Sequence, residues 1–535
     1  MEYLILVPVL LTIVAGALMY AFRFQTRKFR EAFLLVILVI NCALVWWIAF
    51  NAPGEPLIIA RFADKLHLTF FVDGPAKIFS CLVATLWIPA TVYAFDYMDG
   101  ISERHVYPKE EDLLKLKNFY EPLPQVGTDE EEILLTLHQN GSPNTLAQTG
   151  GRYYGFVNGG ALPVTLAVKW LTDVWDQNSV LYVASPIAGV IEEVCEKWIV
   201  DLFGLPTETA MGLVGGSSDA SLCALTVARN TILERNGYNI YENGLMGAPE
   251  IRVVLSENAH ATIFKALSIL GIGSKNIIKV ESNPDGTLRL DKLPELDEKT
   301  ILILQAGNVN TGAFDQFDTL CDLANEKNAW IHIDGAFGLW AKTSKEYAYL
   351  AKGMEKATSW SVDAHKTLNV PYDCGIVLCK YRDAFCKALQ ANGDYIIYSG
   401  KRDGMLYTTA MSRRARSFEL WAAIKYLGKE GIGTLVEALC KNAKTFAERL
   451  SQLGFTILND VVYNQVLIQY VDDEMTKCVL EYIQEDRVCW CGPTQWKGNM
   501  AIRLSVCSWA TTKEDLELCI DSFKRGIEYT KKNEK

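Results

Sequence analysis

Residues 359–379 read SWSVDAHKTLNVPYDCGIVLC, and this stretch decides how we interpret the rest of the chain. Residues 359–362 resemble the end of a strand, and residues 376–378 resemble a second strand after the turn signals at 371–373. The pair His365-Lys366 lies between the two. A lysine held at a strand end by short turns is partly desolvated, which lowers its pKa and favours the neutral amine that attacks carbonyl groups. The stretch therefore predicts a Schiff-base lysine, although most lysines in proteins are simply solvated.

A second segment, WIHIDGAFGLW at 330–340, gives this lysine a partner. Residues 329–333 have the pattern of a buried strand, and Asp334 follows at its carboxyl end, where open α/β sheets place their ligand sites. A carboxylate in that position can keep a pyridine nitrogen protonated, as in sites for pyridoxal 5'-phosphate (PLP). Asp334 and Lys366 together therefore predict a PLP site, which neither residue predicts alone.

The motifs HIDGAFG and DAHKTLNVPYDCG carry a family resemblance. From about residue 107 onward the chain resembles the group II PLP-dependent amino-acid decarboxylases. The resemblance implies an α/β protein with the PLP-dependent transferase (type I) fold, a mostly parallel central sheet and a smaller C-terminal α+β domain. It also implies PLP as cofactor and an L-amino acid as substrate, which is converted to an amine and carbon dioxide.

The stretch GLVGGSSDASLCALTVAR at 212–229 joins a glycine-rich turn to a helical pattern. Backbone N–H groups at the start of a helix converge and carry part of the positive end of the helix dipole, so they bind phosphate. Gly216, Ser217 and Ser218 are therefore the predicted contacts of the cofactor's phosphate. The turn resembles the phosphate cradle of the same family, with Asp219 where a glutamate is usual.

The family resemblance also implies roles for several single residues. His260 is expected to stack on the pyridine ring, and Ala336 to press on its opposite face, with His365 beside Lys366 in the cofactor site. Tyr395, in the glycine-containing segment QANGDYIIYSGKRDG, is expected to return a proton to the α-carbon, with Tyr398 and Tyr407 as rivals. We therefore take Lys366, Tyr395 and His260 as the catalytic candidates.

The segment GGRYYGFVNGGALP at 150–163 is rich in glycine and aromatic residues. A similar stretch of the family passes near the active site, so Tyr154 and Phe156 are the predicted substrate contacts. An aromatic core at the entry of the domain explains the same pattern equally well.

Composition limits the function further. The 535 residues suffice for several domains, and the net charge of -11 argues against nucleic acid as a partner, because phosphate backbones bind basic patches. The 14 cysteines lack the spacing of a zinc site, so we expect no metal. Their number and scatter suit a reducing cytosol.

The first hundred residues are apolar. Uncharged runs at 3–22, 32–50 and 78–95 are each long enough to cross a bilayer, and they predict three transmembrane helices. The basic cluster between the first two runs should stay in the cytoplasm, which predicts a multi-pass membrane protein with its catalytic domain on the cytoplasmic side. A cleaved signal peptide would have one shorter run and is the weaker interpretation.

This region is also similar to the amino terminus of antiporter-like subunits of NADH:quinone oxidoreductase. Such subunits relay protons through buried Lys and Glu residues, and the short run of helices here lacks that relay. A natural fusion that anchors the enzyme and a chimeric gene model both remain open. The predicted organisation is a membrane region at 1–98, a linker and entry segment at 99–155, a large PLP-binding domain at 156–408 and a small domain at 409–535.

Two other functions remain as alternatives to decarboxylation. One is a membrane-anchored PLP-dependent carbon-carbon lyase of the sphingosine-phosphate lyase type, and the other is a non-catalytic subunit of a membrane complex. The resemblance implies a homodimer as the assembly. Which amino acid is the substrate does not follow from the sequence.

Overall fold

The computed structural model describes residues 6–21, 27–51, 57–63, 66–70, 72–102, 106–391 and 393–533. The chain divides into two compact units, Met1–Arg104 and His105–Lys535. The division falls after α3 (Gly74–Ser102), so the predicted boundary at 98/99 is too early: the helix continues through it.

In its described residues, the first unit has three helices and a hairpin. The helices are α1 (Val7–Ala21), α2 (Arg27–Asn51) and α3, and β1 (Leu57–Ala63) pairs antiparallel with β2 (Leu66–Phe70). The indole N–H of Trp46 in α2 donates to Thr85 Oγ1 in α3 at 3.0 Å, which joins the two long helices.

Two of the three predicted membrane spans have a counterpart among the described residues. Lys28–Asn51 and Gly74–Val92 are long and apolar enough to cross a membrane, by length and composition. The first predicted span falls on a shorter apolar helix, Val7–Met19, and the ends of that span lie outside the described residues. Three spans are therefore not established.

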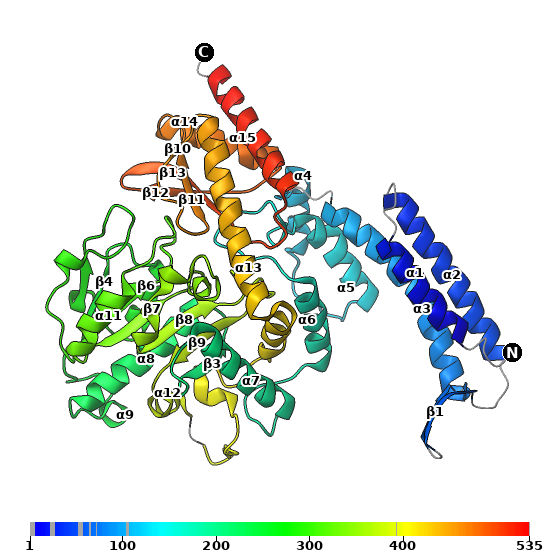
Figure 1. Ribbon diagram of the computed structural model, residues 1–535, viewed down its shortest axis with the longest axis horizontal. Helices are drawn as coiled ribbons and strands as arrows, with labels where there is room; N and C mark the ends of the chain where they lie inside the picture. The colour runs from blue at the N-terminus through cyan, green and yellow to red at the C-terminus, as the bar shows by residue number, and fades with distance from the viewer. Residues whose placement is uncertain are drawn as a thin grey trace. The chain divides into compact units, whose positions relative to one another are not determined.

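The second unit is built around a seven-stranded sheet in the order β3-β9-β8-β7-β6-β4-β5 (Figure 1). Neighbouring strands are parallel except at β9, which runs antiparallel to both β3 and β8. This arrangement confirms the predicted α/β class with a mostly parallel sheet. The strands are β3 (Ala210–Val214), β4 (Arg252–Ser256), β5 (Ile277–Val280), β6 (Thr300–Gln305), β7 (Trp330–Asp334), β8 (Ser359–Asp363) and β9 (Gly375–Cys379).

The central strands are buried on both faces, which explains their continuous apolar sequences. In β6, Ile301 and Ile303 belong to one apolar core, whereas Leu302 and Leu304 belong to the core on the opposite face. The helices of this domain are α6 (Pro163–Trp175), α7 (Pro186–Phe203), α8 (Ser217–Arg235), α9 (Ile240–Asn243), α10 (Ala261–Ile269), α11 (Phe317–Glu326) and α12 (Arg382–Leu389). Short 3-10 turns cover Ser274–Asn276, Leu290–Lys292, Leu339–Thr343, Ala348–Ala351, Met354–Lys356 and Gly404–Tyr407.

A smaller α+β domain follows, as predicted. Its antiparallel sheet has the order β10-β11-β13-β12. The elements are α13 (Ser417–Gln452), β10 (Thr456–Ile457), β11 (Gln465–Gln469), α14 (Asp473–Asp486), β12 (Gly492–Trp496), β13 (Asn499–Ser505) and α15 (Lys513–Asn533).

The long helix α13 belongs to both domains, as Figure 1 shows. Leu420 and Val436 in its first part pack in the core of the large domain, and Phe446 and Leu450 in its last part pack in the core of the small domain. The change of domain therefore falls inside α13, later than the predicted boundary at 408/409. The reason is that α13 bends at Gly428, and the helical part after this kink supplies apolar side chains to the two cores in succession.

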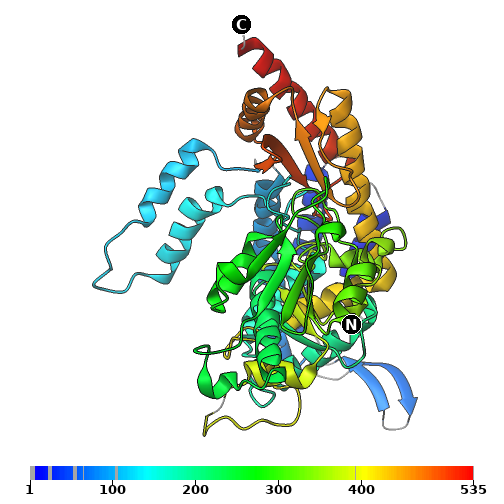
Figure 2. The same ribbon diagram turned by 90° about the vertical axis from the view of Figure 1, so that its left-hand side faces the viewer.

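The entry segment of the second unit forms an arm, which projects from the two domains in Figure 2. It contains α4 (Glu110–Leu113), α5 (Glu130–Thr136) and short turns at Leu114–Phe119, Leu137–Gly141 and Ser142–Asn144. None of these five elements has a buried residue. The arm therefore contributes little to the core of its own chain.

Candidate active site

Two neighbouring parallel strands, β7 and β8, position the two central residues. Asp334 is the last residue of β7, and β8 ends at Asp363, three residues before Lys366. Asp334 pairs in register with Ser361 of β8. The carboxyl ends of both strands therefore face the same edge of the sheet, where such folds bind ligands.

Lys366 and Asp334 line one small cavity of about 50 Å³. The same cavity brings together three further residues that the sequence predicted, His260, Ala336 and Phe156. Its other walls are Val157, Gln305, Gly307, Val309 and Phe337. Four predicted partners of the coenzyme and one predicted substrate contact, Phe156, thus meet at one place, whereas Gly216, Ser217, Ser218 and His365 do not line this cavity.

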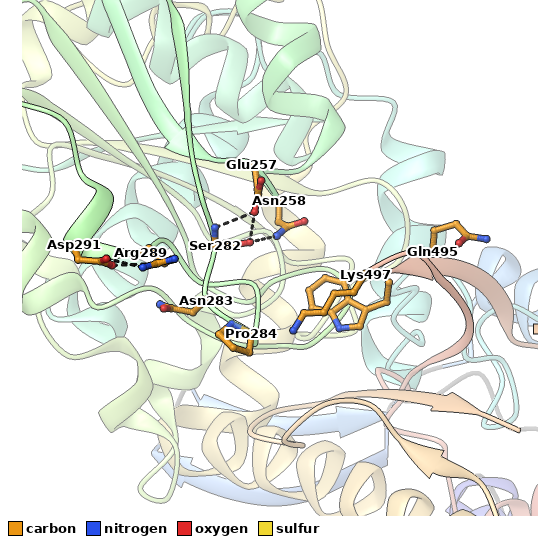
Figure 3. Close-up of a pocket in the computed structure, with 10 residues that line it drawn as sticks. Glu257, Asn258, Ser282, Asn283, Pro284, Arg289, Asp291, Gln495 and Lys497 are labelled. Atoms are coloured by element: carbon orange, nitrogen blue, oxygen red, sulfur yellow. Dashed lines mark hydrogen bonds and ion pairs between the residues drawn. The ribbon is translucent and has the colours of Figure 1, made fainter. Parts of the chain in front are cut away.

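A larger hollow of about 690 Å³ lies beside the end of β4 and the turn between β12 and β13 (Figure 3). Its polar side chains bind one another: Ser282 donates its hydroxyl to Glu257 at 2.7 Å, and Arg289 pairs with Asp291 at 2.6 Å. Because these groups already have partners, we place the candidate site at the smaller cavity.

Asp334 is only 7 % exposed. Its Oδ1 accepts one hydrogen bond, from the backbone N–H of Ala336 at 3.2 Å. Burial raises the pKa of this carboxyl above its ordinary value, while the charges of His260 and Lys366 act in the opposite direction. A protonated pyridine nitrogen would supply the strong donor that this buried carboxylate lacks.

His260 caps the start of α10. Its Nδ1 lies 2.7 Å from Thr262 Oγ1 and accepts from the Thr262 N–H at 3.3 Å. Burial lowers the pKa of the imidazole, and the positive charges of Lys366 and Arg503 lower it further, against the pull of Asp334. The neutral form of the ring is therefore favoured, and the ring is fixed at the cavity wall, as a ring-stacking role requires.

Lys366 does not have the depressed pKa that the sequence suggests. Burial lowers its pKa, but the Asp363 carboxylate 2.9 Å from Nζ raises it, with help from Asp334, and the net pKa lies above the ordinary lysine value. The prediction of a neutral resting amine is therefore wrong. The sequence correctly predicts that the lysine is desolvated. It does not predict that the Asp363 carboxylate, three residues earlier, raises the pKa.

The predicted phosphate cradle forms the start of α8. Gly216 is the N-cap, Ser217 is the first helical residue, and Ser218 is exposed to solvent. The Ser217 N–H donates to Asp363 Oδ1 at 2.6 Å, so this first-turn donor is held by a carboxylate. His365 lies at the same place, since a Cβ on Gly216 would be 3.5 Å from its ring.

Close backbone contacts explain the glycines near the lysine turn. A Cβ on Gly375 would lie 2.5 Å from the backbone of Gly216, and a Cβ on Gly159 would lie 2.0 Å from the Lys366 carbonyl oxygen. Asn369 Oδ1 also accepts the N–H groups of Gly160 and Trp509 at 2.6 and 2.9 Å. The lysine turn is thus fixed between the cradle, the entry segment and the small domain.

The two predicted substrate contacts have different surroundings. Phe156 lines the cavity, is 65 % exposed and stacks on Trp490 with ring centroids 5.5 Å apart. Tyr154 is 1 % exposed in the core of the small domain, packs on Phe446 and donates its hydroxyl to the Gly151 carbonyl at 2.9 Å. The assignment of Tyr154 to the substrate pocket is therefore corrected: its side chain points into a core.

The structure does not bring Tyr395 to the cavity. Its side chain is 81 % exposed on the loop before Arg402. Of its rivals, Tyr398 donates to the Ala391 carbonyl at 2.6 Å, and Tyr407 is buried under the guanidinium of Arg402. Tyr407 is therefore a packing residue, and the role of Tyr395 stays a prediction.

Three residues at the site were missed in the sequence. Asp363 stands inside the quoted motif, but only the structure shows that it faces both Lys366 and α8. Gln305 lines the cavity, and its buried Nε2 has no hydrogen-bond partner. Arg503 in β13 donates to the carbonyl of Val309, a cavity residue, at 3.2 Å. The end of β6 was the one sequence signal for Gln305, and nothing singled out Arg503.

These residues fit PLP. A buried carboxylate, a lysine, a neutral imidazole and an unsatisfied amide surround one cavity, and the N-terminus of α8 lies next to the lysine turn. Such a donor set matches the ring nitrogen, aldehyde, aromatic ring and phosphate of that cofactor. The larger hollow has no comparable set among its lining residues.

Comparisons with known proteins identify the fold and the family. The chain is 26% identical over 447 residues to an aromatic-L-amino-acid decarboxylase of Bacillus atrophaeus. The matched region covers 79% of this chain and 90% of that protein. It is also 26% identical to an acidic amino acid decarboxylase of Mus musculus, over 64% of both chains. Catharanthus roseus tryptophan decarboxylase in complex with L-tryptophan has the same fold, with a TM-score of 0.74 and 20% identity over 83% of this chain and 98% of the other.

The family match itself covers most of the second unit. It starts at residue 115, so the resemblance of residues 1–98 to antiporter-like subunits stays a prediction. The matching model is described as the pyridoxal-dependent decarboxylase conserved domain and spans residues 115–471. Because that span exceeds half of the chain and contains Lys366 and Asp334, the protein belongs to the pyridoxal-dependent decarboxylase family.

Proposed function

We propose that this protein removes the α-carboxylate of an L-amino acid as carbon dioxide and releases the amine. The observation that carries the proposal is the single cavity shared by Lys366 and Asp334. PLP, when bound there, supplies an aromatic system that accepts the electrons of the broken carbon-carbon bond. Lys366 holds the cofactor covalently, Asp334 keeps its ring nitrogen protonated, and His260 and Ala336 enclose its ring.

The test is a panel of the twenty amino acids, with amine and carbon dioxide measured for each. We expect carbon dioxide and amine in equal amounts from a small subset. Lys366→Ala should abolish both, while its melting temperature shows that the chain is folded. Release of an aldehyde from a phosphorylated sphingoid base, without carbon dioxide from any amino acid, would instead support the lyase alternative.

Arg503 is the proposed anchor for a carboxylate of the substrate. It is partly buried, and its pKa is lowered by burial with no contribution from any carboxylate of the described residues. Its charge reaches His260 in the cavity wall. Among the described residues the guanidinium donates only to the Val309 carbonyl, which lies at the cavity. Its other donors suit a carboxylate, because such pairs form two parallel hydrogen bonds.

The panel also identifies the substrate class. The relatives act on aromatic and on acidic amino acids, and every amino acid has an α-carboxylate that Arg503 could bind. If Arg503 binds that group, its replacement should lower kcat/KM for all substrates by the same factor. If it binds a side-chain carboxylate, only aspartate, glutamate and similar substrates should lose rate.

Tyr395 is the proposed proton donor. The base of its loop is fixed, because Asp403 accepts the N–H groups of Tyr182 and Ser399 at 2.9 and 2.7 Å. The tyrosine itself is exposed. Protonation of the α-carbon requires this loop to approach the cavity of its own chain or of a second copy.

A homodimer is the proposed assembly. The arm exposes Leu114, Tyr120, Leu123, Val126 and Leu134, and a second apolar surface on α6 and its neighbourhood exposes Trp170, Leu171, Val174, Val183 and Ile187. Apolar surface of this extent marks an interface. Light scattering should give twice the chain mass, and Val174→Asp should reduce it to the chain mass.

Attachment to a membrane through the first unit is a further proposal. The exposed residues of α2 and α3 are largely apolar, including Val39, Trp47, Phe50, Ile78 and Phe79. We expect the full chain to stay in the membrane pellet after an alkaline carbonate wash, with its catalytic unit open to protease added on the cytoplasmic side. Release into the supernatant would refute the anchor. Copurification with a large respiratory assembly would instead support a subunit role.

A further inference from the structure

Asp363 links the two ends of the cofactor site. The residue is 1 % exposed. Oδ2 forms an ion pair with Lys366 Nζ at 2.9 Å, and Oδ1 accepts from the Ser217 N–H at 2.6 Å. The backbone holds it in place, because its N–H donates to the Ala336 carbonyl at 2.9 Å and its own carbonyl accepts the Trp340 indole N–H at 2.9 Å.

This arrangement conflicts with a loaded cofactor in two ways. A phosphate at the start of α8 needs the Ser217 N–H and is repelled by a neighbouring carboxylate. Covalent attachment needs the free amine of Lys366, whereas the carboxylate favours the ammonium. Both conflicts disappear if one proton moves from Lys366 to Asp363, since a carboxylic acid can donate a hydrogen bond to phosphate.

Resting on the function proposed above, we propose that Asp363 is a positioning residue that couples phosphate binding to the release of Lys366. Without cofactor it holds the lysine as an unreactive ammonium and occupies the Ser217 N–H. When phosphate binds at α8, Asp363 takes one proton from Lys366.

The step balances within the site. The Lys366 ammonium gives one proton to the Asp363 carboxylate, which becomes a neutral acid. The amine lone pair then forms the bond to the aldehyde carbon, the two remaining amine protons leave with the aldehyde oxygen as water, and a carbon-nitrogen double bond results. No proton has to pass to or from bulk solvent.

Other titratable groups also face this pair. Asp334 and Cys507 act on Lys366, and the charge of Asp363 reaches His260, His365 and Tyr372. Among the described residues, Asp363 forms an ion pair with Lys366 Nζ, and none of these five does. Asp363 is therefore the group in direct contact with both the lysine and the helix start.

The test follows cofactor attachment rather than turnover. Full-length protein stripped of cofactor is mixed with PLP between pH 7 and 9, and attachment is followed by the long-wavelength absorbance of the lysine-bound cofactor and by borohydride trapping. The wild-type rate should change less than about twofold over this range, because the proton moves internally. In Asp363→Asn the proton must go to water, so the rate should be lower at pH 7 and rise by up to about tenfold per pH unit.

Pyridoxal, which lacks the phosphate, is the second probe. The wild type should prefer PLP over pyridoxal by a larger factor than Asp363→Asn does, because only PLP displaces the carboxylate. A wild-type rate that rises about tenfold per pH unit, with Asp363→Asn equally fast or faster, would overturn the coupling, and the wild-type profile decides this even if the variant is unstable. Failure of PLP to attach to Lys366 at any pH would refute the proposed function instead.

Discussion

Replacement of Arg503 by methionine should separate substrate binding from folding. Among the described residues, the guanidinium donates one hydrogen bond, to the Val309 carbonyl, so its other donors are available to a ligand. Hydrogen bonds to charged groups contribute about 1.5–3 kcal/mol. Loss of that contribution from the transition state corresponds to a fall in kcat/KM of about 10-fold to 150-fold. Because no buried carboxylate is left unpaired, stability should fall by only about 1 kcal/mol.

The assay is carbon dioxide release at saturating PLP, with kcat and KM measured separately and the melting temperature followed in parallel. Arg503→Lys keeps the charge but lacks the planar fork, and it should recover part of the loss. Arg449→Met removes an exposed arginine that pairs with Glu517, and it serves as the matched control with unchanged kinetics. A kcat/KM for Arg503→Met within about twofold of wild type would refute the anchoring role, since the arginine would then be structural.

Four further changes test other parts of the site. Asp334→Asn should keep the lysine-bound absorbance but lower kcat by about 10²–10³-fold, because the ring nitrogen loses its carboxylate; unchanged kcat would contradict that role. Gly375→Ala should destabilise the fold by about 1–3 kcal/mol, because the added Cβ meets the Gly216 backbone at 2.5 Å; denaturant unfolding measures this, with Gly273→Ala, where no atom lies within 4 Å, as control. Tyr395→Phe should lower amine formation by about 10²–10⁴-fold without changing the melting temperature, since the side chain is exposed; normal amine formation would exclude the proton donor. Burial lowers the pKa of His332 from 6.5 to about 3, so the unfolded chain binds more protons between these values and stability should rise with pH across that window; a His332→Gln variant with the same slope would contradict the assignment.

The sequence was sufficient for the fold class and for the residues at the ends of strands. Asp334 and Lys366 could be placed at one edge because parallel strands present their carboxyl ends together. The apolar run of residues 329–333 likewise predicted a buried strand, which is β7 in the structure. These features depend on the local pattern and on a general rule of sheet topology, so they need no coordinates.

The directions of side chains could not be predicted in the same way. Asp363 and Tyr154 lie in segments that the sequence identified correctly, yet one faces the lysine and the other faces a core. From the sequence, burial alone predicts a lowered pKa for Lys366. In the structure, the nearby carboxylate outweighs burial and raises that pKa. The division of α13 between two domains could not be predicted either. An amphipathic pattern shows which face of a helix is buried but not which core each turn packs against.

The most direct test of Lys366 as the cofactor's attachment point is to identify the peptide that carries the coenzyme by its mass. The full-length protein is loaded with PLP, reduced with borohydride, digested and sequenced by mass spectrometry. The pyridoxyl group should be found on Lys366, in wild type and in the Arg449→Met control. A label on any other lysine, or none at all in a folded chain, would contradict the claim that Lys366 and Asp334 hold one cofactor between them.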